Sequence, residues 1–284
     1  MNSVGSIFSD FILNLDNQYD KQEAEQVTLL AFEDVFDYKR IDIGINKDRI
    51  ANPDELLKIR KILAELKSGK PIQYILGYCW FAGLKMAVNS NVLIPRRETE
   101  ELVDWIVKDI NQMEVKPKVI LDVCTGSGCI AIALKKAFPQ LDIYANDDSP
   151  DALIIAKENA ANNKTDITFV KMDALKLILE ISPDIIVSNP PYVREMEKEQ
   201  MHSLVTDFEP AHALFVPDND SLIFYRAISE WAIANMNRNG NIYFEINELM
   251  GISISELTSR LGFKNPVIRK DFQEKDRMIK ATKV

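Results

Sequence analysis

Asp184-Ile-Ile-Val-Ser-Asn-Pro-Pro-Tyr192 is the stretch of sequence that decides the fold. Its first half is a short apolar run rich in β-branched residues, which is typical of a strand buried on both faces. Two consecutive prolines cannot donate hydrogen bonds to a β-ladder, so the strand must end before Pro190. In sheets of this kind, ligands bind beyond the carboxyl ends of the strands, so we expect a site at this point.

Strands and helices alternate on both sides of this stretch, from residue 98 to the end of the sequence. The predicted strands cover residues 119–123, 142–145, 167–170, 184–188, 241–246, 266–271 and 277–282. The predicted helices cover residues 98–110, 129–137, 150–161, 222–236 and 249–261. This alternation predicts an α/β fold with a mostly parallel sheet that is covered by helices on both faces.

The first seventy residues show only helical periodicity. The third predicted helix has the clearest start, with Asn52 as the N-cap, Pro53 at the first helical position and Glu55 completing a capping box. We therefore expect a helical domain over residues 1–70 and an α/β domain over residues 96–284.

The segment between these two domains, residues 71–95, shows an apolar period of two. Its alternating residues are Tyr74, Leu76 and Tyr78 before a predicted turn at Ala82-Gly83, and Leu84, Met86 and Val88 after it. This pattern predicts a β-hairpin that links the domains.

The composition excludes several classes of protein. The 284 residues include 34 basic and 43 acidic side chains, a net charge of −9, and 46% hydrophobic residues. The apolar content excludes a disordered chain, and no apolar run approaches the roughly 20 residues of a membrane-spanning helix. The first fifteen residues hold Asp10 and no basic residue, so we expect no signal peptide. The acidic balance argues against a stable nucleic-acid complex, and a monomer is expected.

The cysteines do not predict a disulfide framework, because Cys79, Cys124 and Cys129 are odd in number and widely spread. A reduced, cytoplasmic setting is therefore expected. We expect no zinc site, because no C-x-x-C pair exists and only His202 and His212 could join the cysteines. Both histidines are interpreted as surface or structural residues rather than catalytic bases.

A glycine-containing loop, Asp122-Val-Cys-Thr-Gly-Ser-Gly128, follows the predicted strand at residues 119–123. Glycine lets the backbone approach a ligand closely. The next strand leads to Asp147, about twenty residues after the loop, where an acid can bind a ribose diol. The third leads to Asp173, where a side chain could reach an adenine amino group. The occurrence of the glycine loop and these two acids at the ends of three successive strands predicts a nucleoside site. A tight turn with solvated acids is the alternative interpretation.

The acids indicate which nucleoside ligand to expect. A glycine loop can bind pyrophosphate, but Asp122 would repel a phosphate. A cationic ligand suits Asp122 and Asp147 better, and S-adenosylmethionine carries both an ammonium and a sulfonium group. We therefore expect S-adenosylmethionine as the cofactor, and no metal.

Asn189-Pro-Pro-Tyr192 predicts a binding site for a planar –NH2 group. The prolines fix the backbone and restrict Asn189, which precedes one of them. The Pro190 carbonyl and the Asn189 side-chain carbonyl then form two rigid acceptors that can hold both hydrogens of the group. Tyr192 offers an aromatic surface for it to pack on. A proline turn with a buried tyrosine is the structural alternative.

These motifs together resemble the class I S-adenosylmethionine-dependent methyltransferases that act on –NH2 nitrogen. Leu93-Ile-Pro-Arg-Arg-Glu-Thr-Glu100 is similar to the I-P-R-x-[ED]-T-E signature of the HemK-type glutamine methyltransferases of peptide chain release factors. Further segments match this family in order: Gly69-Lys-Pro-Ile-Gln-Tyr-Ile-Leu-Gly77, Phe208-Glu-Pro210 with Ala213-Leu214, Phe224-Tyr-Arg226, Phe244-Glu-Ile246 and Lys275-Asp-Arg277. The resemblance covers nearly the whole chain beyond about Gly69, whereas the N-terminal helices match only in type and length. Cys124 stands where many members have Gly, and Ala174 where some have an aromatic residue.

The resemblance implies a Rossmann-like, seven-stranded class I methyltransferase domain preceded by a small helical domain and a β-hairpin linker. It implies methyl transfer from S-adenosylmethionine to the side-chain amide nitrogen of the glutamine in the Gly-Gly-Gln motif of peptide chain release factors, which would be the protein partners. The implied catalytic residues are Asn189, Pro190, Pro191 and Tyr192. The implied cofactor-binding residues are Asp122, Cys124, Thr125, Gly126, Ser127, Gly128, Asp147, Asp173, Ala174 and Asn189. Arg96 is expected to shape the cofactor-side wall or the domain junction.

Two other functions stay open on the sequence. A nucleic-acid methyltransferase acting on an adenine or guanine amino group would use the same Asn-Pro-Pro-Tyr logic, although the net charge and the segment at residues 93–100 favour a protein substrate. A non-enzymatic adaptor that binds a partner through its helical domain is disfavoured by the intact loop, acids and Asn-Pro-Pro-Tyr.

Overall fold

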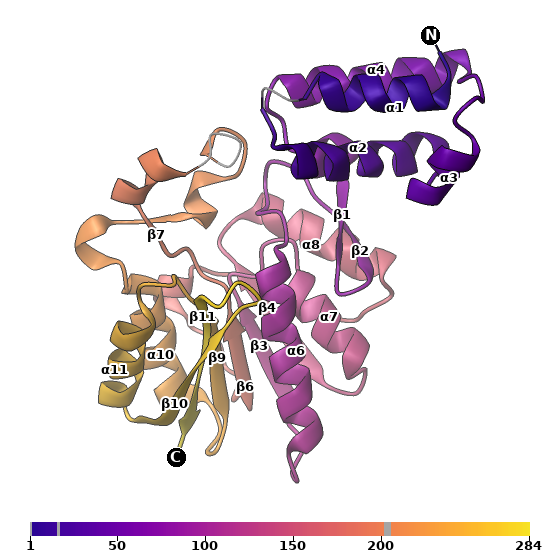
Figure 1. The fold of residues 1–284 in the computed structure, drawn as a ribbon. Coiled ribbons are helices and arrows are strands. Elements are labelled where there is room, and N and C mark those ends of the chain that lie inside the picture. The colour runs from indigo at the N-terminus through magenta and orange to yellow at the C-terminus, as the bar shows by residue number, and fades with distance from the viewer. Residues whose placement is uncertain (1, 16–17, 202–205) are drawn as a thin grey trace. The chain divides into compact units, whose positions relative to one another are not determined.

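The computed structural model describes residues 2–15, 18–201 and 206–284, and the chain divides into two compact units. The first is built mainly from Met1–Tyr78, and the second from Cys79–Met201 and Glu209–Val284. The first unit is helical, and the second contains a seven-stranded sheet between helices (Figure 1). The α/β class with a preceding helical region, expected from the sequence, is confirmed.

Within its described residues up to Tyr78, the first unit contains five helices. They are α1 (Val4–Leu13), α2 (Lys21–Phe36), α3 (Arg40–Ile45), α4 (Pro53–Lys67) and α5 (Ile72–Leu76). Phe11, Phe32 and Leu66 lie in the core that α1, α2 and α4 bury between them. The predicted start of α4 is confirmed, because the Asn52 side chain accepts from the Glu55 backbone N–H while the Glu55 carboxylate accepts from the Asn52 N–H.

The β-hairpin is shorter than the sequence pattern predicts. It consists of β1 (Tyr78–Phe81) and β2 (Leu84–Ala87), joined at Ala82 and Gly83, whose φ angles of 48° and 74° are those of a tight hairpin turn. The prediction that the strand begins at Tyr74 is wrong, since Tyr74 and Leu76 lie in α5. The reason is local: Pro71 caps the start of this single helical turn, and Gly77 ends it at a φ of 77°.

The sheet of the second unit contains the seven predicted strands. Their bounds are β3 (Val119–Val123), β4 (Asp142–Asp147), β5 (Thr168–Lys171), β6 (Ile185–Ser188), β9 (Asn241–Glu245), β10 (Phe263–Lys270) and β11 (Asp276–Lys283). Their order is β10-β11-β9-β6-β3-β4-β5, with β9, β6, β3, β4 and β5 parallel to one another and β11 antiparallel to both of its neighbours. All four residues of β6 are buried, as its apolar run predicts.

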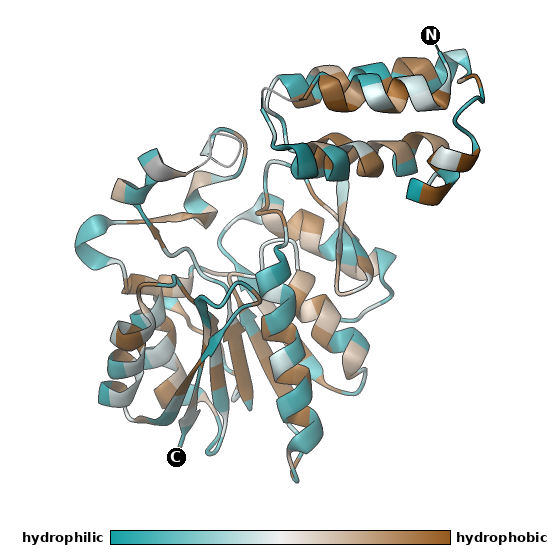
Figure 2. Ribbon diagram, viewed as in Figure 1, coloured by the Kyte–Doolittle hydropathy of each residue, from teal (hydrophilic) through white to brown (hydrophobic). Residues whose placement is uncertain are grey.

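Helices cover both faces of this sheet (Figure 1). One face carries α6 (Arg97–Gln112), α7 (Cys129–Ala137) and α8 (Pro150–Asn162), and the other carries α10 (Ile223–Asn235) and α11 (Gly251–Leu261). Figure 2 shows the central strands as mostly hydrophobic and the outer faces of the helices as largely hydrophilic, which places the core against the sheet.

Short elements that the sequence does not predict occupy the connections. A second two-stranded sheet, which is parallel, is formed by β7 (Val193–Arg194) and β8 (Phe215–Val216). The 3₁₀ turns among the described residues are η1 (Ala174–Lys176), η2 (Glu195–Gln200), η3 (Ala211–Ala213) and η4 (Asp218–Asp220). Their lengths of a few residues carry too little periodicity to be recognised.

Candidate functional site

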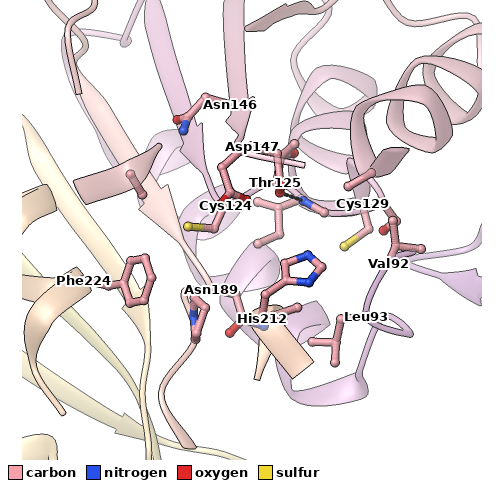
Figure 3. Close-up of a pocket in the computed structure, with 18 of the residues that line it drawn as sticks. Val92, Leu93, Cys124, Thr125, Cys129, Asn146, Asp147, Asn189, His212 and Phe224 are labelled. Atoms are coloured by element: carbon pink, nitrogen blue, oxygen red, sulfur yellow. Dashed lines mark hydrogen bonds between the residues drawn. The ribbon is translucent and has the colours of Figure 1, made fainter. Parts of the chain in front are cut away.

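A pocket of about 250 Å³ lies within the second unit, at the carboxyl ends of β3, β4, β5 and β6. Each of these four strands contributes the residues that directly follow or end it, as the topology of a parallel sheet requires. Figure 3 shows side chains from these loops, including Asp147 and Asn189, around one space. The structure therefore brings together the strand ends that the sequence singles out.

The loop after β3 supplies the floor of the pocket. Cys124, Gly126 and Gly128 have φ angles of 60°, 53° and 80°, so the backbone enters the left-handed region three times. At Gly126 an added Cβ would meet open space, whereas at Gly128 it would lie 3.2 Å from the Cβ of Ala156 in α8. Cys124 thus adopts a conformation that favours glycine. The loop is held to β4 by the Thr125 N–H, which donates to the Asn146 carbonyl at 2.9 Å.

Asp122 lies outside the pocket lining, fully buried at the end of β3. Its Oδ2 accepts from the Thr125 hydroxyl at 2.6 Å and from the Ala131 N–H at 3.2 Å, so it ties the loop to the start of α7. Its Oδ1 is buried and accepts no hydrogen bond from the described residues. Burial raises the pKa of Asp122 to about 7, which the two hydrogen bonds partly oppose.

Asp147 ends β4 and lines the pocket. Its two carboxylate oxygens accept from the backbone N–H groups of Gly126 at 2.8 Å and Ser149 at 3.0 Å. Burial raises the pKa of Asp147, and these bonds together with the nearby His212 oppose the shift. Each oxygen keeps a free lone pair, so the carboxylate can also accept from a ligand hydroxyl.

The end of β5 supplies the next part of the wall. Asp173 lines the pocket, and its Oδ1 accepts from the Leu175 N–H at 2.8 Å at the start of η1. Ala174 also lines the pocket while its side chain joins the main core.

The end of β6 places Asn189 and Pro191 on the pocket and buries Pro190. The Asn189 Nδ2 donates to the Thr99 hydroxyl oxygen at 3.3 Å, and its Oδ1 accepts no hydrogen bond within the described ranges. Tyr192 lies outside the lining, where its hydroxyl donates to Glu245 Oε1 at 3.0 Å. Burial, and the negative charge of Glu245, raise the pKa of Tyr192.

Several pocket residues are missing from the site that the sequence predicts. They are Asn91, Val92, Leu93, Pro95, Thr99, Cys129, Ile130, Asn146, Asp148, Ala152, Met172, Leu175, His212, Ala213 and Phe224. His212, interpreted from sequence as a surface or structural residue, is exposed and lines the pocket with its ring (Figure 3). His202 lies outside the described residues. Six of these pocket residues lie in the sequence segments 93–100, 208–214 and 224–226, whose motifs could have indicated them.

Arg96 also lines the pocket, as its place before α6 suggests. Its guanidinium pairs with the buried carboxylate of Glu209, whose other oxygen accepts from the Ile94 N–H at 3.1 Å. The pair therefore fixes the loop that carries His212 against the segment that leads into α6.

Asn159 of α8 joins the hairpin to the pocket floor. Its Oδ1 accepts from the Ala87 N–H at 2.6 Å, and its Nδ2 donates to the Ala87 carbonyl at 3.0 Å and to the Ser127 carbonyl at 2.9 Å. The buried side chain thus uses both amide hydrogens and its oxygen on backbone groups.

In the described part of the chain, no group of three or more His, Cys, Asp or Glu side chains is placed so that it could hold a metal ion. Among the helices that the structure describes, none combines the length and apolar content needed to cross a membrane. All three cysteines are free thiols.

Known proteins resemble this chain along nearly its whole length. Residues 103–214 match the family model of the Methyltransferase small domain, and residues 9–77 that of the PrmC N-terminal domain. A release factor glutamine methyltransferase from Flavobacterium psychrophilum is 46% identical over 96% of each chain, and one from Bacteroides thetaiotaomicron is 39% identical over 95% of this chain and 96% of its own.

Solved structures show the same fold. A 16S rRNA methyltransferase from T. thermophilus, in complex with AdoMet and guanosine, superposes with a TM-score of 0.52 at 14% identity, covering 73% of this chain and 50% of its own. The fold, the pocket at the strand ends and the extended sequence identity agree, and this chain belongs to the family of release factor glutamine methyltransferases.

Proposed function

We propose that the protein methylates the side-chain amide nitrogen of the glutamine in the Gly-Gly-Gln motif of peptide chain release factors, with S-adenosylmethionine as the methyl donor. The observation that carries this proposal is the amide of Asn189, whose oxygen is without a protein partner among the described residues while the side chain lines the pocket. It stands beside the Pro190 carbonyl at the rigid end of β6.

The pocket fits the proposed cofactor. Its wall contains the acids Asp147, Asp148 and Asp173, which suit a cationic ligand, and the buried Asn146 Oδ1, which accepts no hydrogen bond from the described residues. When bound, S-adenosylmethionine supplies a methyl group made electrophilic by the adjacent sulfonium.

Different parts of the wall would hold different parts of this ligand. Asp147 would accept from the ribose hydroxyls, and Asp173 with Ala174 would contact the adenine. The loop backbone and side chains at Cys124, Thr125, Gly126 and Ser127 would contact the remainder. Asp122 and Gly128, which lie outside the lining, would act by holding this loop in shape.

The amide nitrogen of glutamine is a poor nucleophile, because its lone pair is delocalised into the carbonyl. Acceptors at Asn189 Oδ1 and the Pro190 carbonyl can bind its two hydrogens and hold the lone pair in line with the methyl group. Such alignment contributes up to about 7–11 kcal/mol. Both carbonyl dipoles also stabilise the positive charge that develops on nitrogen.

No strong base is required before the attack, because the methylated nitrogen is acidic and can release its proton afterwards. Tyr192 does not act as that base in this mechanism, since its hydroxyl donates to Glu245 and burial raises its pKa. Its ring instead provides a packing surface for the amide, and Pro191 keeps the backbone rigid beside it.

The remaining chain serves recognition in this proposal. Residues 1–70 form the domain that binds the release factor, residues 71–95 form the linker, and residues 96–284 carry out the chemistry. The match of residues 9–77 to an N-terminal domain shared with the family supports this division.

Transfer of labelled methyl from S-adenosylmethionine to a purified release factor, to RNA, or to neither tests the proposal. We expect label on the glutamine of the release factor, and a turnover about 10²–10³ lower for Asn189→Ala, the usual loss for one hydrogen-bonding group in catalysis. Asn235→Ala is the matched control, because this amide only donates to the Trp231 carbonyl in α10, away from the pocket. Label on RNA alone would favour the nucleic-acid alternative, and a fully active Asn189→Ala variant would refute the mechanism.

A further inference from the structure

A chain of hydrogen bonds leads from Asn189 into the protein interior. The Asn189 Nδ2 donates to Thr99 Oγ1 at 3.3 Å, and the Thr99 hydroxyl donates to Glu245 Oε2 at 2.6 Å. Thr99 lies in the first turn of α6 and Glu245 ends β9, and both side chains are buried. These hydrogen bonds therefore connect a pocket residue to a carboxylate that does not itself line the pocket.

The direction of these hydrogen bonds is set by Glu245. An ionised carboxylate can only accept, so the single proton of the Thr99 hydroxyl must go to it. The Thr99 oxygen then has only lone pairs left for Asn189. An amide that offers Nδ2 to those lone pairs presents its Oδ1 on the opposite side, whereas the flipped amide would set two oxygens against each other.

Hydrogen bonds and one positive charge oppose the rise that burial causes in the pKa of Glu245. Its second oxygen accepts from the Tyr192 hydroxyl at 3.0 Å, and its positive neighbour is Arg277 of β11, which opposes the rise that burial causes in the pKa of Glu245. Glu98 of α6 acts in the other direction. The Tyr225 hydroxyl of α10 donates to the backbone carbonyl of Glu245, which fixes the position of this residue.

We propose that Thr99 and Glu245 are positioning residues that fix the Asn189 amide with its oxygen toward the substrate. This inference rests on the proposed function, in which Asn189 Oδ1 accepts a hydrogen from the glutamine –NH2. A flipped Asn189 would present its own –NH2 to the substrate –NH2, and two donors cannot form a hydrogen bond. The Thr99 hydroxyl therefore determines that this part of the pocket accepts a donor group.

The test combines Thr99→Val, which has a similar shape and no hydroxyl, with a change at Asn189. Thr99→Val should lower kcat about tenfold, the equivalent of one neutral hydrogen bond, and leave the affinity for S-adenosylmethionine unchanged in calorimetry. Thr99→Ser should restore kcat, because it keeps the hydroxyl. Thr258→Val is the matched control: this buried hydroxyl donates only to carbonyls of its own helix, α11.

A double variant distinguishes positioning from a general structural role. Asn189→Asp carries an acceptor oxygen on both sides, so its orientation no longer matters and adding Thr99→Val should not lower its kcat further. If the Thr99 hydroxyl had only a structural role, Thr99→Val would lower kcat by the same factor in the wild type and in Asn189→Asp. That result would overturn the inference. Thr99→Ala, which also lacks the hydroxyl, serves in the same way if Thr99→Val folds poorly.

The experiments distinguish a failure of the positioning role from a failure of the proposed function. Full activity of Thr99→Val together with a strongly impaired Asn189→Ala would overturn the positioning role and leave the proposed function standing. Full activity of Asn189→Ala would remove the function on which the inference rests.

Discussion

Gly128 allows the sharpest prediction about stability, because a close neighbour offers a matched comparison. Replacing it with alanine places a Cβ in a left-handed backbone, at a φ of 80°, and 3.2 Å from both Ala156 Cβ and Ile132 Cδ1. The conformational cost is about 1–2 kcal/mol, and crowding two packed helices adds about 1–3 kcal/mol. We expect Gly128→Ala to lower the free energy of unfolding by about 2–5 kcal/mol in total.

Gly126→Ala is the control for the conformational cost alone. Gly126 also has a left-handed φ, of 53°, but its added Cβ would meet nothing within 4 Å. It should therefore cost only about 1–2 kcal/mol. The difference between the two variants measures the crowding against α7 and α8.

Urea unfolding followed by tryptophan fluorescence, without cofactor, provides the assay. Trp80, Trp105 and Trp231 are the three tryptophans of the sequence, and all lie in the second unit, so the signal reports on the unit that contains the loop. Equal losses for Gly126→Ala and Gly128→Ala would refute the argument that close packing at Gly128 fixes the loop.

Four further results are expected. Asp147→Ala should weaken S-adenosylmethionine binding by ~1–3 kcal/mol, and unchanged affinity in calorimetry would contradict the proposed contact of Asp147 with the ribose. Tyr192→Phe should stay active in single-turnover assays and Tyr192→Ala should not, because in the proposed mechanism the ring rather than the hydroxyl packs on the substrate; equal losses would contradict this. Burial raises the pKa of Asp122 to about 7, above its unfolded value, so the folded state holds a proton that it loses as the pH rises through this value. Between about pH 6 and about pH 8, the free energy of unfolding of the wild type should fall by about 1.4 kcal/mol, whereas that of Asp122→Asn should not. If denaturant titrations show the same pH dependence of this free energy in both proteins, the titration of Asp122 in this range is disproved. Removing the residues before Pro71 should abolish methylation of an intact release factor and preserve cofactor binding, and methylation by the truncated protein would disprove the recognition role.

The fold follows from the sequence where one element is long enough to show its period. The predicted helix at residues 129–137 matches α7 at both ends, and the β-branched runs at β3 and β6 lie where they are expected. The sequence pattern at α5 predicts a strand wrongly, because three apolar residues at alternate positions fit either a helical turn or a strand over so short a length. The strands β7 and β8 have two residues each and carry no period at all.

The candidate site is predictable to the extent that it consists of strand ends. Asp147, Asp173 and Asn189 follow directly from the parallel topology, which collects the carboxyl ends of the strands. Thr99 and Glu245 do not, because they are 146 residues apart and meet only when α6 packs over β9. A sequence shows which residues end a strand, but not which side chain accepts a hydrogen bond from a distant one.

Asn159 has a mechanical consequence for the pocket. It binds both backbone groups of Ala87 as a neighbouring strand would, and the same amide holds the Ser127 carbonyl in the loop. A displacement of the hairpin away from α8 would therefore strain the loop after β3 through these hydrogen bonds. We therefore expect β2 and the pocket floor to move together, so that a displacement of β2 changes the shape of the pocket.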